Sequence, residues 1–129
     1  MKSNLIKIGT LSLGLLAASQ AYASWSDVTQ PVELNALHTN TTLKGQAANG
    51  DAFYGHFYEG GFGTMMVNGA KLRAPWHLNG NREMCVELQE GTECFRYQRT
   101  GEFKTLYRAI RVRDGLAIPV TVEKSVPEY

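Results

Sequence analysis

The sequence predicts an all-β fold, an antiparallel meander of about eight strands that forms a small up-and-down barrel or a strongly curved sheet after one short N-terminal helix. From Thr41 onward, runs rich in aromatic and β-branched residues alternate with glycine-containing turns, which is the pattern of successive β-hairpins. Within these runs the apolar residues tend to fall on one face. The seven turns that indicate about eight strands are Asn49-Gly50-Asp51, Glu59-Gly60-Gly61, Asn68-Gly69, Asn79-Gly80-Asn81, Glu90-Gly91, Thr100-Gly101 and Asp114-Gly115.

Residues 1–23 are expected to be an export signal. Lys2 and Lys7 give it a basic start, residues 8–18 form an uncharged apolar run, and Ala21-Tyr22-Ala23 is typical of a cleavage site. The apolar run is shorter than the roughly 20 residues that a membrane-spanning helix needs, so no permanent membrane anchor is expected. Residues 24–129 should form a single β domain that is periplasmic or secreted.

A short helix is expected between Ser26 and His38, with Asp27 or Thr29 as its cap and Asn40 ending it in a left-handed conformation. Its apolar residues recur on roughly one side: Val32, Leu34 and Leu37.

The register of the middle strands follows from their turns, because a slip of one residue would send every side chain to the other face. A two-residue turn at Asn68-Gly69 pairs Met65 with Leu72, and a three-residue loop over 79–81 pairs Trp76 with Met84. These registers give one continuous apolar face: Met65, Val67, Leu72, Ala74, Trp76, Leu78, Met84, Val86, Phe95 and Tyr97.

The last hairpin fits the same pattern if residues 113–115 form its loop, because Ile110 then faces Ile118. Pro119 falls on the other face of the final strand and lacks a backbone N–H group. We therefore expect this strand to lie near a sheet edge or at a bulge.

Cys85 and Cys94 are the only two cysteines, and in an exported protein they are expected to form a disulfide. Removing Lys2 and Lys7 with the signal leaves 11 basic residues against 12 acidic ones, a charge of −1, which argues against nucleic-acid binding. The sequence contains no recognisable catalytic motif, and its histidines lack the spacing of metal ligands, so we expect no enzyme activity, metal or cofactor.

One candidate site lies on the interior side. A two-residue turn at Thr100-Gly101 places Glu93 opposite Arg108 and Lys104 beside Tyr97. A buried charge needs a partner. Either Glu93 and Arg108 form an ion pair with each other, or Arg108 and Lys104 bind an anionic ligand. The predicted ligand-binding residues around an interior mouth are Trp76, Tyr97, Lys104 and Arg108.

A second candidate site is the stripe formed by Tyr54, His56 and Tyr58 at alternate positions. A three-residue loop at Glu59-Gly60-Gly61 would put Phe53 and Phe57 inside and turn this stripe outward, whereas a two-residue loop would reverse both. Burial of two phenylalanines favours the first arrangement. The corresponding interaction patch is Tyr54, His56, Tyr58, Phe62 and Met66.

The segment Leu37 to Gly45, followed by Trp76, Cys85-Val86 and Cys94, resembles a family of small exported proteins of Gram-negative bacteria with the pattern Asn-Thr-Leu-x-Gly, Trp, Cys-Val and Cys. An extra Thr interrupts the first motif here. The resemblance implies an exported β protein and no particular activity. From the β architecture and the two candidate sites, we expect a lipocalin-like binder of a small apolar or anionic ligand in the cell envelope, or alternatively a protein-interaction module such as an inhibitor of an envelope hydrolase.

Overall fold

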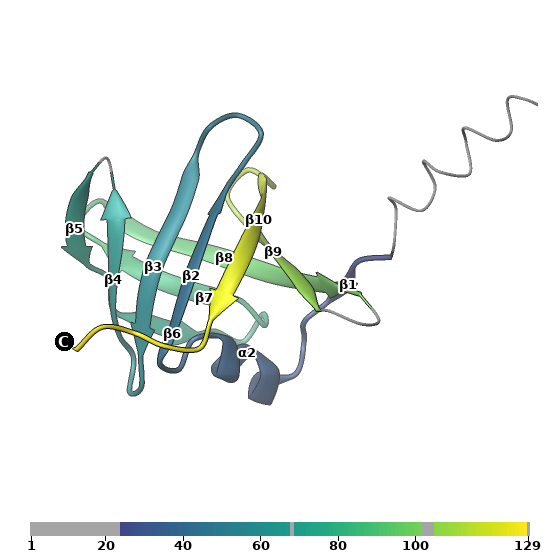
Figure 1. Cartoon of the computed structure of the whole chain (residues 1–129), viewed down its shortest axis with the longest axis horizontal. Helices are drawn as coiled ribbons and strands as arrows, with labels where there is room; N and C mark the ends of the chain where they lie inside the picture. Colours follow the sequence, from purple (N-terminus) through teal and green to yellow (C-terminus); the bar gives the residue numbers. More distant parts are fainter. Residues whose placement is uncertain (1–23, 68, 102–104, 129) are drawn as a thin grey trace, which may run out of the picture.

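The computed structural model describes residues 24–67, 69–101 and 105–128, and within these ranges it contains one short helix and ten strands (Figure 1). The predicted export signal lies outside the described residues. The elements are β1 Ser26–Asp27, α2 Pro31–Leu37, β2 Thr41–Gln46, β3 Ala52–Tyr58, β4 Phe62–Val67, β5 Ala70–Arg73, β6 Trp76–Leu78, β7 Met84–Leu88, β8 Gly91–Thr100, β9 Leu106–Arg111 and β10 Ala117–Glu123. No helix among the described residues is long and apolar enough to cross a membrane.

The strands form one antiparallel meander in the order β5-β4-β3-β2-β10-β9-β8-β7-β6, with β1 paired to β8. This confirms the predicted fold class, as a strongly curved sheet rather than a barrel closed by strand pairing. The terminal strands β5 and β6 are consecutive in the chain. The linker between them bonds to a strand on either side, because Ala74 N donates to Gly63 O of β4 at 2.8 Å and Glu87 N of β7 donates to Pro75 O at 2.9 Å.

The described residues form ten strands, against the predicted eight or so, for two reasons. Pro75 lies in the linker that separates β5 from β6, and it has no N–H group to continue a ladder. Residues Ser26–Asp27, which were expected to start the helix, instead pair with Arg99 and Gln98 of β8.

The helix α2 is short, as expected, but begins differently. Gln30 is its N-cap and makes no side-chain capping bond, so the predicted caps Asp27 and Thr29 are wrong. Pro31 supplies the first helical turn, where its missing N–H group costs nothing. Asn40 has a φ of 53°, as the sequence predicted. The helix covers one end of the curved sheet (Figure 1).

The β3–β4 register is the predicted one, since Tyr58 pairs with Phe62 across a three-residue loop. Met65 pairs with Leu72 and Met84 with Phe95, which are also the predicted pairs.

The β6–β7 and β9–β10 hairpins differ from prediction. Trp76 pairs with Val86 instead of Met84, a shift of two residues that keeps the same face inside. The loop between β9 and β10 is longer by one residue, because Arg111 N donates to Leu116 O. Ile118 therefore pairs with Ala109, and Ile110 lies on the other face. The strand predicted to lie near an edge or bulge because of Pro119 is flanked by β2 and β9, which makes it central.

The core is an aromatic layer between the curved sheet and α2. The largest side chains with almost no accessible surface include Phe53, Phe57, Tyr97, Leu34 and Met84. Cys85 and Cys94 form the predicted disulfide, with an S–S length of 2.05 Å. Cys85 alternates with the inward-facing Met84 and Val86, so the disulfide lies on the opposite face of the sheet from the core.

Candidate interaction surface on strands β3 to β5

The predicted aromatic stripe lies on the outside of the sheet. Phe53 and Phe57 are buried, so the residues of β3 that alternate with them, including Tyr54 and His56, point outward. His56 pairs with Thr64 of β4, which places alternate residues of the two strands on the same face. We call the resulting surface the outer aromatic face: Tyr54, His56, Tyr58, Phe62 and Met66. Of these residues, Tyr54, Phe62 and Met66 are 37%, 51% and 39% exposed.

The outer aromatic face contains a pocket of about 390 Å³, which we call the β4 pocket. Its volume lies in the range of small-molecule sites, roughly 300 to 1,000 Å³. The residues that line it are Tyr54, His56, Thr64, Met65, Met66 and Lys71. The ring of Tyr54 packs edge-on against that of His56, with a centroid distance of 5.3 Å, which orders one wall.

The orientation of His56 follows from its hydrogen bonds. Thr42 Oγ1 donates its single proton to the Ser125 carbonyl oxygen at 2.7 Å, so it must accept from His56 Nδ1, which lies 2.8 Å away. Neutral His56 therefore keeps a lone pair on Nε2 and can accept a hydrogen bond there. Partial burial, followed by the nearby Lys71 charge, lowers the pKa of His56 below its usual value of 6.5, which favours this neutral form.

Thr64 contributes an unusual group to the β4 pocket. The residue is only 6% exposed, and its Oγ1 atom has no hydrogen-bond partner within the described ranges. A buried hydroxyl group left unpaired costs about 1–3 kcal/mol. Thr64 pairs with His56, which faces outward, so the Thr64 hydroxyl group also lies on the outer side of the sheet and not in the core.

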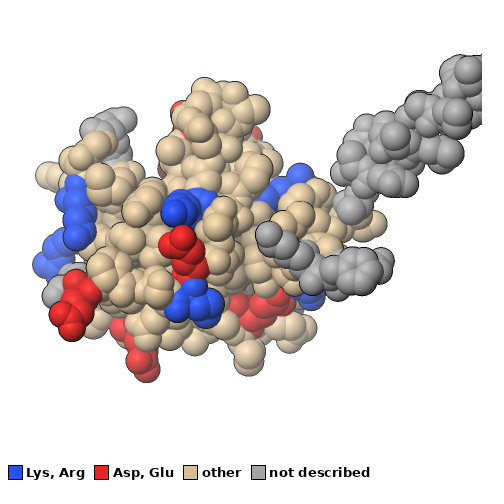
Figure 2. Space-filling model, viewed as in Figure 1, with Lys and Arg blue, Asp and Glu red and all other residues tan. Residues whose placement is uncertain are grey.

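Lys71 brings positive charge to the same pocket. It pairs with Met66, and in the part of the chain that the structure describes it forms no ion pair. The other lysine on this side of the sheet, Lys44 of β2, is 3.3 Å from Glu123. Figure 2 shows this face as a mostly uncharged surface over β3 and β4, with basic side chains over β5 at one side. The surface is thus apolar with a positive margin.

The predicted interior ligand site does not assemble. Trp76 and Tyr97 lie in the core, at 8% and 1% exposed, and the Trp76 indole N–H donates to Tyr58 O. Arg108 lies on the outer face, where it donates to Gln98 Oε1 at 2.7 Å and stacks 4.3 Å from the Trp25 ring centroid. Lys104 lies outside the described residues.

The predicted pairing of Glu93 with Arg108 is wrong. Strand β9 is shifted by five residues relative to the two-residue turn expected at Thr100-Gly101, so Arg108 pairs with Gln98. Glu93 instead forms an ion pair with Arg113 at 3.2 Å.

His38 occupies the centre of the interior, and its position was not evident from the sequence. It is fully buried, its Nδ1 lies 2.7 Å from Leu34 O, and its ring is 4.9 Å from that of Tyr97 and 5.1 Å from that of Phe57. An interior cavity of ligand size would leave such residues accessible, so these rings indicate a filled interior. The one sequence feature that could have indicated the burial of His38 is its position directly after an amphipathic helix.

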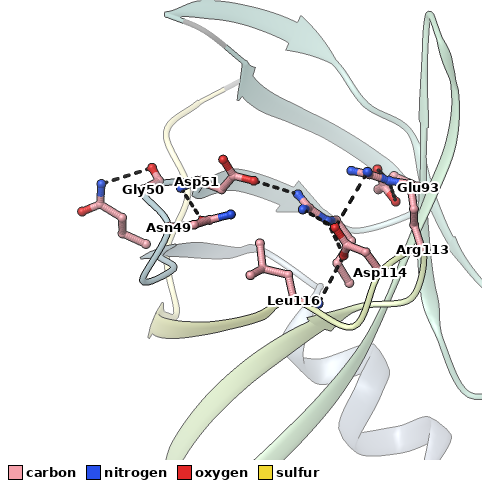
Figure 3. Close-up of polar contacts among 9 residues, drawn as sticks. Asn49, Gly50, Asp51, Glu93, Arg113, Asp114 and Leu116 are labelled. Carbon is pink, nitrogen blue, oxygen red and sulfur yellow. Dashed lines mark hydrogen bonds and ion pairs between the residues drawn. The ribbon is translucent and has the colours of Figure 1, made fainter.

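A cation does face inward at the open end of the sheet, but it is Arg111. It pairs with the buried Phe95, and its guanidinium group binds Asp51 at 3.3 Å and Asp114 at 2.7 Å. These contacts join the loop before β3 to the loop before β10, next to the Arg113–Glu93 pair (Figure 3). The hydrogen bond from Arg111 holds the pKa of Asp114 well below its usual value. Two carboxylates satisfy Arg111, so this cluster is a structural clamp.

Comparisons with protein-family models, with curated proteins and with solved structures find no match to this chain.

Proposed function

We propose that this protein is an exported, non-catalytic interaction module of the Gram-negative cell envelope, and that its outer aromatic face binds a protein partner such as an envelope hydrolase. The observation that carries the proposal is the contrast between a filled interior and exposed Tyr54, Phe62 and Met66 around a pocket. Aromatic and methionine side chains are enriched at the centres of protein interfaces.

An interior ligand binder is the weaker alternative. It requires an accessible cavity between the sheet and the helix, whereas His38, Phe57 and Tyr97 pack ring against ring there. The β4 pocket lies on the outside of the sheet and is surrounded by other exposed apolar side chains, as expected of an anchor point within a larger interface.

Export is part of the proposal. The Cys85–Cys94 disulfide is compatible with an oxidising compartment outside the cytoplasm. Mass spectrometry of the protein from its host should give an oxidised chain that begins at Ser24. A chain retaining residues 1–23 in the cytoplasm would contradict the proposed location.

Site-specific photocrosslinking in the native host tests the docking surface. We expect p-benzoylphenylalanine in place of Phe62, which lies beside the β4 pocket, to give an adduct of one discrete mass. The matched control places the same group at Val32, an apolar residue of α2 that is 82% exposed and far along the chain from the face. Equal adducts at both positions, or none at Phe62, would count against the proposal.

A further inference from the structure

The β4 pocket contains polar groups that an apolar docking face does not itself require. Thr64 Oγ1 is buried and has no partner among the described residues, although the side chain lies on the outer side of β4. A hydroxyl group can donate one hydrogen bond and accept two, so its position suits a polar atom that arrives with a ligand.

Lys71 supplies a positive charge, so a ligand of this pocket should carry a negative one. It lies opposite Met66, two residues along β4 from Thr64, and both Thr64 and Lys71 line the pocket. Diagonal neighbours on one sheet face are about 7–8 Å apart, within the reach of a lysine side chain. Lys44, by contrast, already has Glu123 as its partner. The unmatched charge at this pocket is therefore positive.

The remaining walls are apolar. Met66 provides flexible, polarisable surface, and Tyr54 is held against His56 as a flat aromatic wall. A ligand that fits must therefore combine an anionic group with an apolar body.

We infer that the β4 pocket takes a carboxylate carried on an apolar group, with the carboxylate between Thr64 Oγ1 and Lys71 Nζ and the apolar group against Met66. This inference rests on the proposed function in assigning the carboxylate to a protein partner, as an acidic or C-terminal residue next to an apolar side chain. A free organic acid presents the same chemistry, and the experiments below separate the two sources.

Binding of a simple probe tests the pocket chemistry directly. We expect 4-phenylbutyrate, titrated into the ¹⁵N-labelled, disulfide-bonded protein, to shift the backbone amide signals of Thr64, Met66 and Lys71. The uncharged analogue 4-phenylbutyramide should bind at least tenfold more weakly. Equal binding of acid and amide, or shifts centred on Arg111 instead, would overturn the inference.

Matched variants test the two polar groups. Lys71→Gln should weaken phenylbutyrate binding at least fivefold, whereas Lys44→Gln, the same change on the same side of the sheet, should alter it less than twofold. Thr64→Val should also weaken binding at least fivefold without lowering the melting temperature, because it removes a buried hydroxyl group that has no partner among the described residues. Wild-type affinity in both Lys71→Gln and Thr64→Val would refute the assignment.

Crosslinking from position 62 separates this inference from the proposed function. If the Phe62 adduct is lost in Lys71→Gln but kept in Lys44→Gln, a partner carboxylate is supported. If the adduct persists in Lys71→Gln and phenylbutyrate does not bind, the carboxylate inference fails while the docking surface stands. If phenylbutyrate binds at the pocket but position 62 gives no adduct, the assignment to a protein partner fails.

Discussion

His38 should make the stability of this protein depend on pH. It is fully buried at the end of α2, where Nδ1 donates to Leu34 O and Nε2 has no partner in the described part of the chain. Burial, reinforced by the nearby Lys124 charge, lowers the pKa of His38 from 6.5 to about 4, although the hydrogen bond to Leu34 acts in the opposite direction.

The size and sign of the effect follow from linkage. The unfolded chain takes up a proton at this residue near pH 6.5, whereas the folded protein resists it until about pH 4. The unfolded state thus binds more protons in that window, so the free energy of unfolding falls as the pH is lowered through it. Because one pH unit between the two pKa values corresponds to about 1.4 kcal/mol, the loss is about 3 kcal/mol.

Urea unfolding at several pH values between 7.5 and 4 measures this loss. Wild type should lose about 3 kcal/mol more than His38→Asn, which keeps an amide donor for Leu34 O but does not titrate. The NMR titration of the His38 ring gives its folded pKa independently. A folded pKa near 6.5, or equal pH slopes for wild type and His38→Asn, would refute the reasoning.

Three further predictions concern stability. Tyr97→Phe should raise the free energy of unfolding by about 1–2 kcal/mol, because the Tyr97 hydroxyl is buried without a partner in the described ranges; a loss measured by urea unfolding would contradict this. Gly45→Ala should prevent folding or lower the free energy of unfolding by more than about 3 kcal/mol, because the new Cβ would lie 1.8 Å from Pro119 O. In the control Gly80→Ala, no atom lies within 4 Å of the new Cβ, so stability should change by less than about 0.5 kcal/mol. Reducing the disulfide, which spans 9 residues, should lower the stability by about 2.5–3 kcal/mol, and an unchanged urea midpoint in dithiothreitol would exclude this.

The outer aromatic face could be predicted from the sequence because its orientation depends on one short turn. With three residues at 59–61, Phe53 and Phe57 must face inward and Tyr54 and His56 outward. The period of a strand is two residues, so this local choice fixed a whole face.

The ion pairs could not be predicted in the same way. Arg108 and Arg111 lie on one strand, and only the true length of the β8–β9 connection decides which of them faces the interior. The sequence marks the turn at Thr100-Gly101 but not how far the strands continue beyond it, and a shift of five residues exchanged their roles.

The meander, the Cys85–Cys94 pairing and the outward aromatic stripe could be predicted from residue order alone, because each depends on strand alternation and on nearby turns. The burial of His38 in the interior, and the burial of Thr64 without a hydrogen-bond partner in the described ranges, became evident only in the three-dimensional fold. These positions arise where the curved sheet brings distant segments together, and the spacing of residues along one strand carries no information about that curvature.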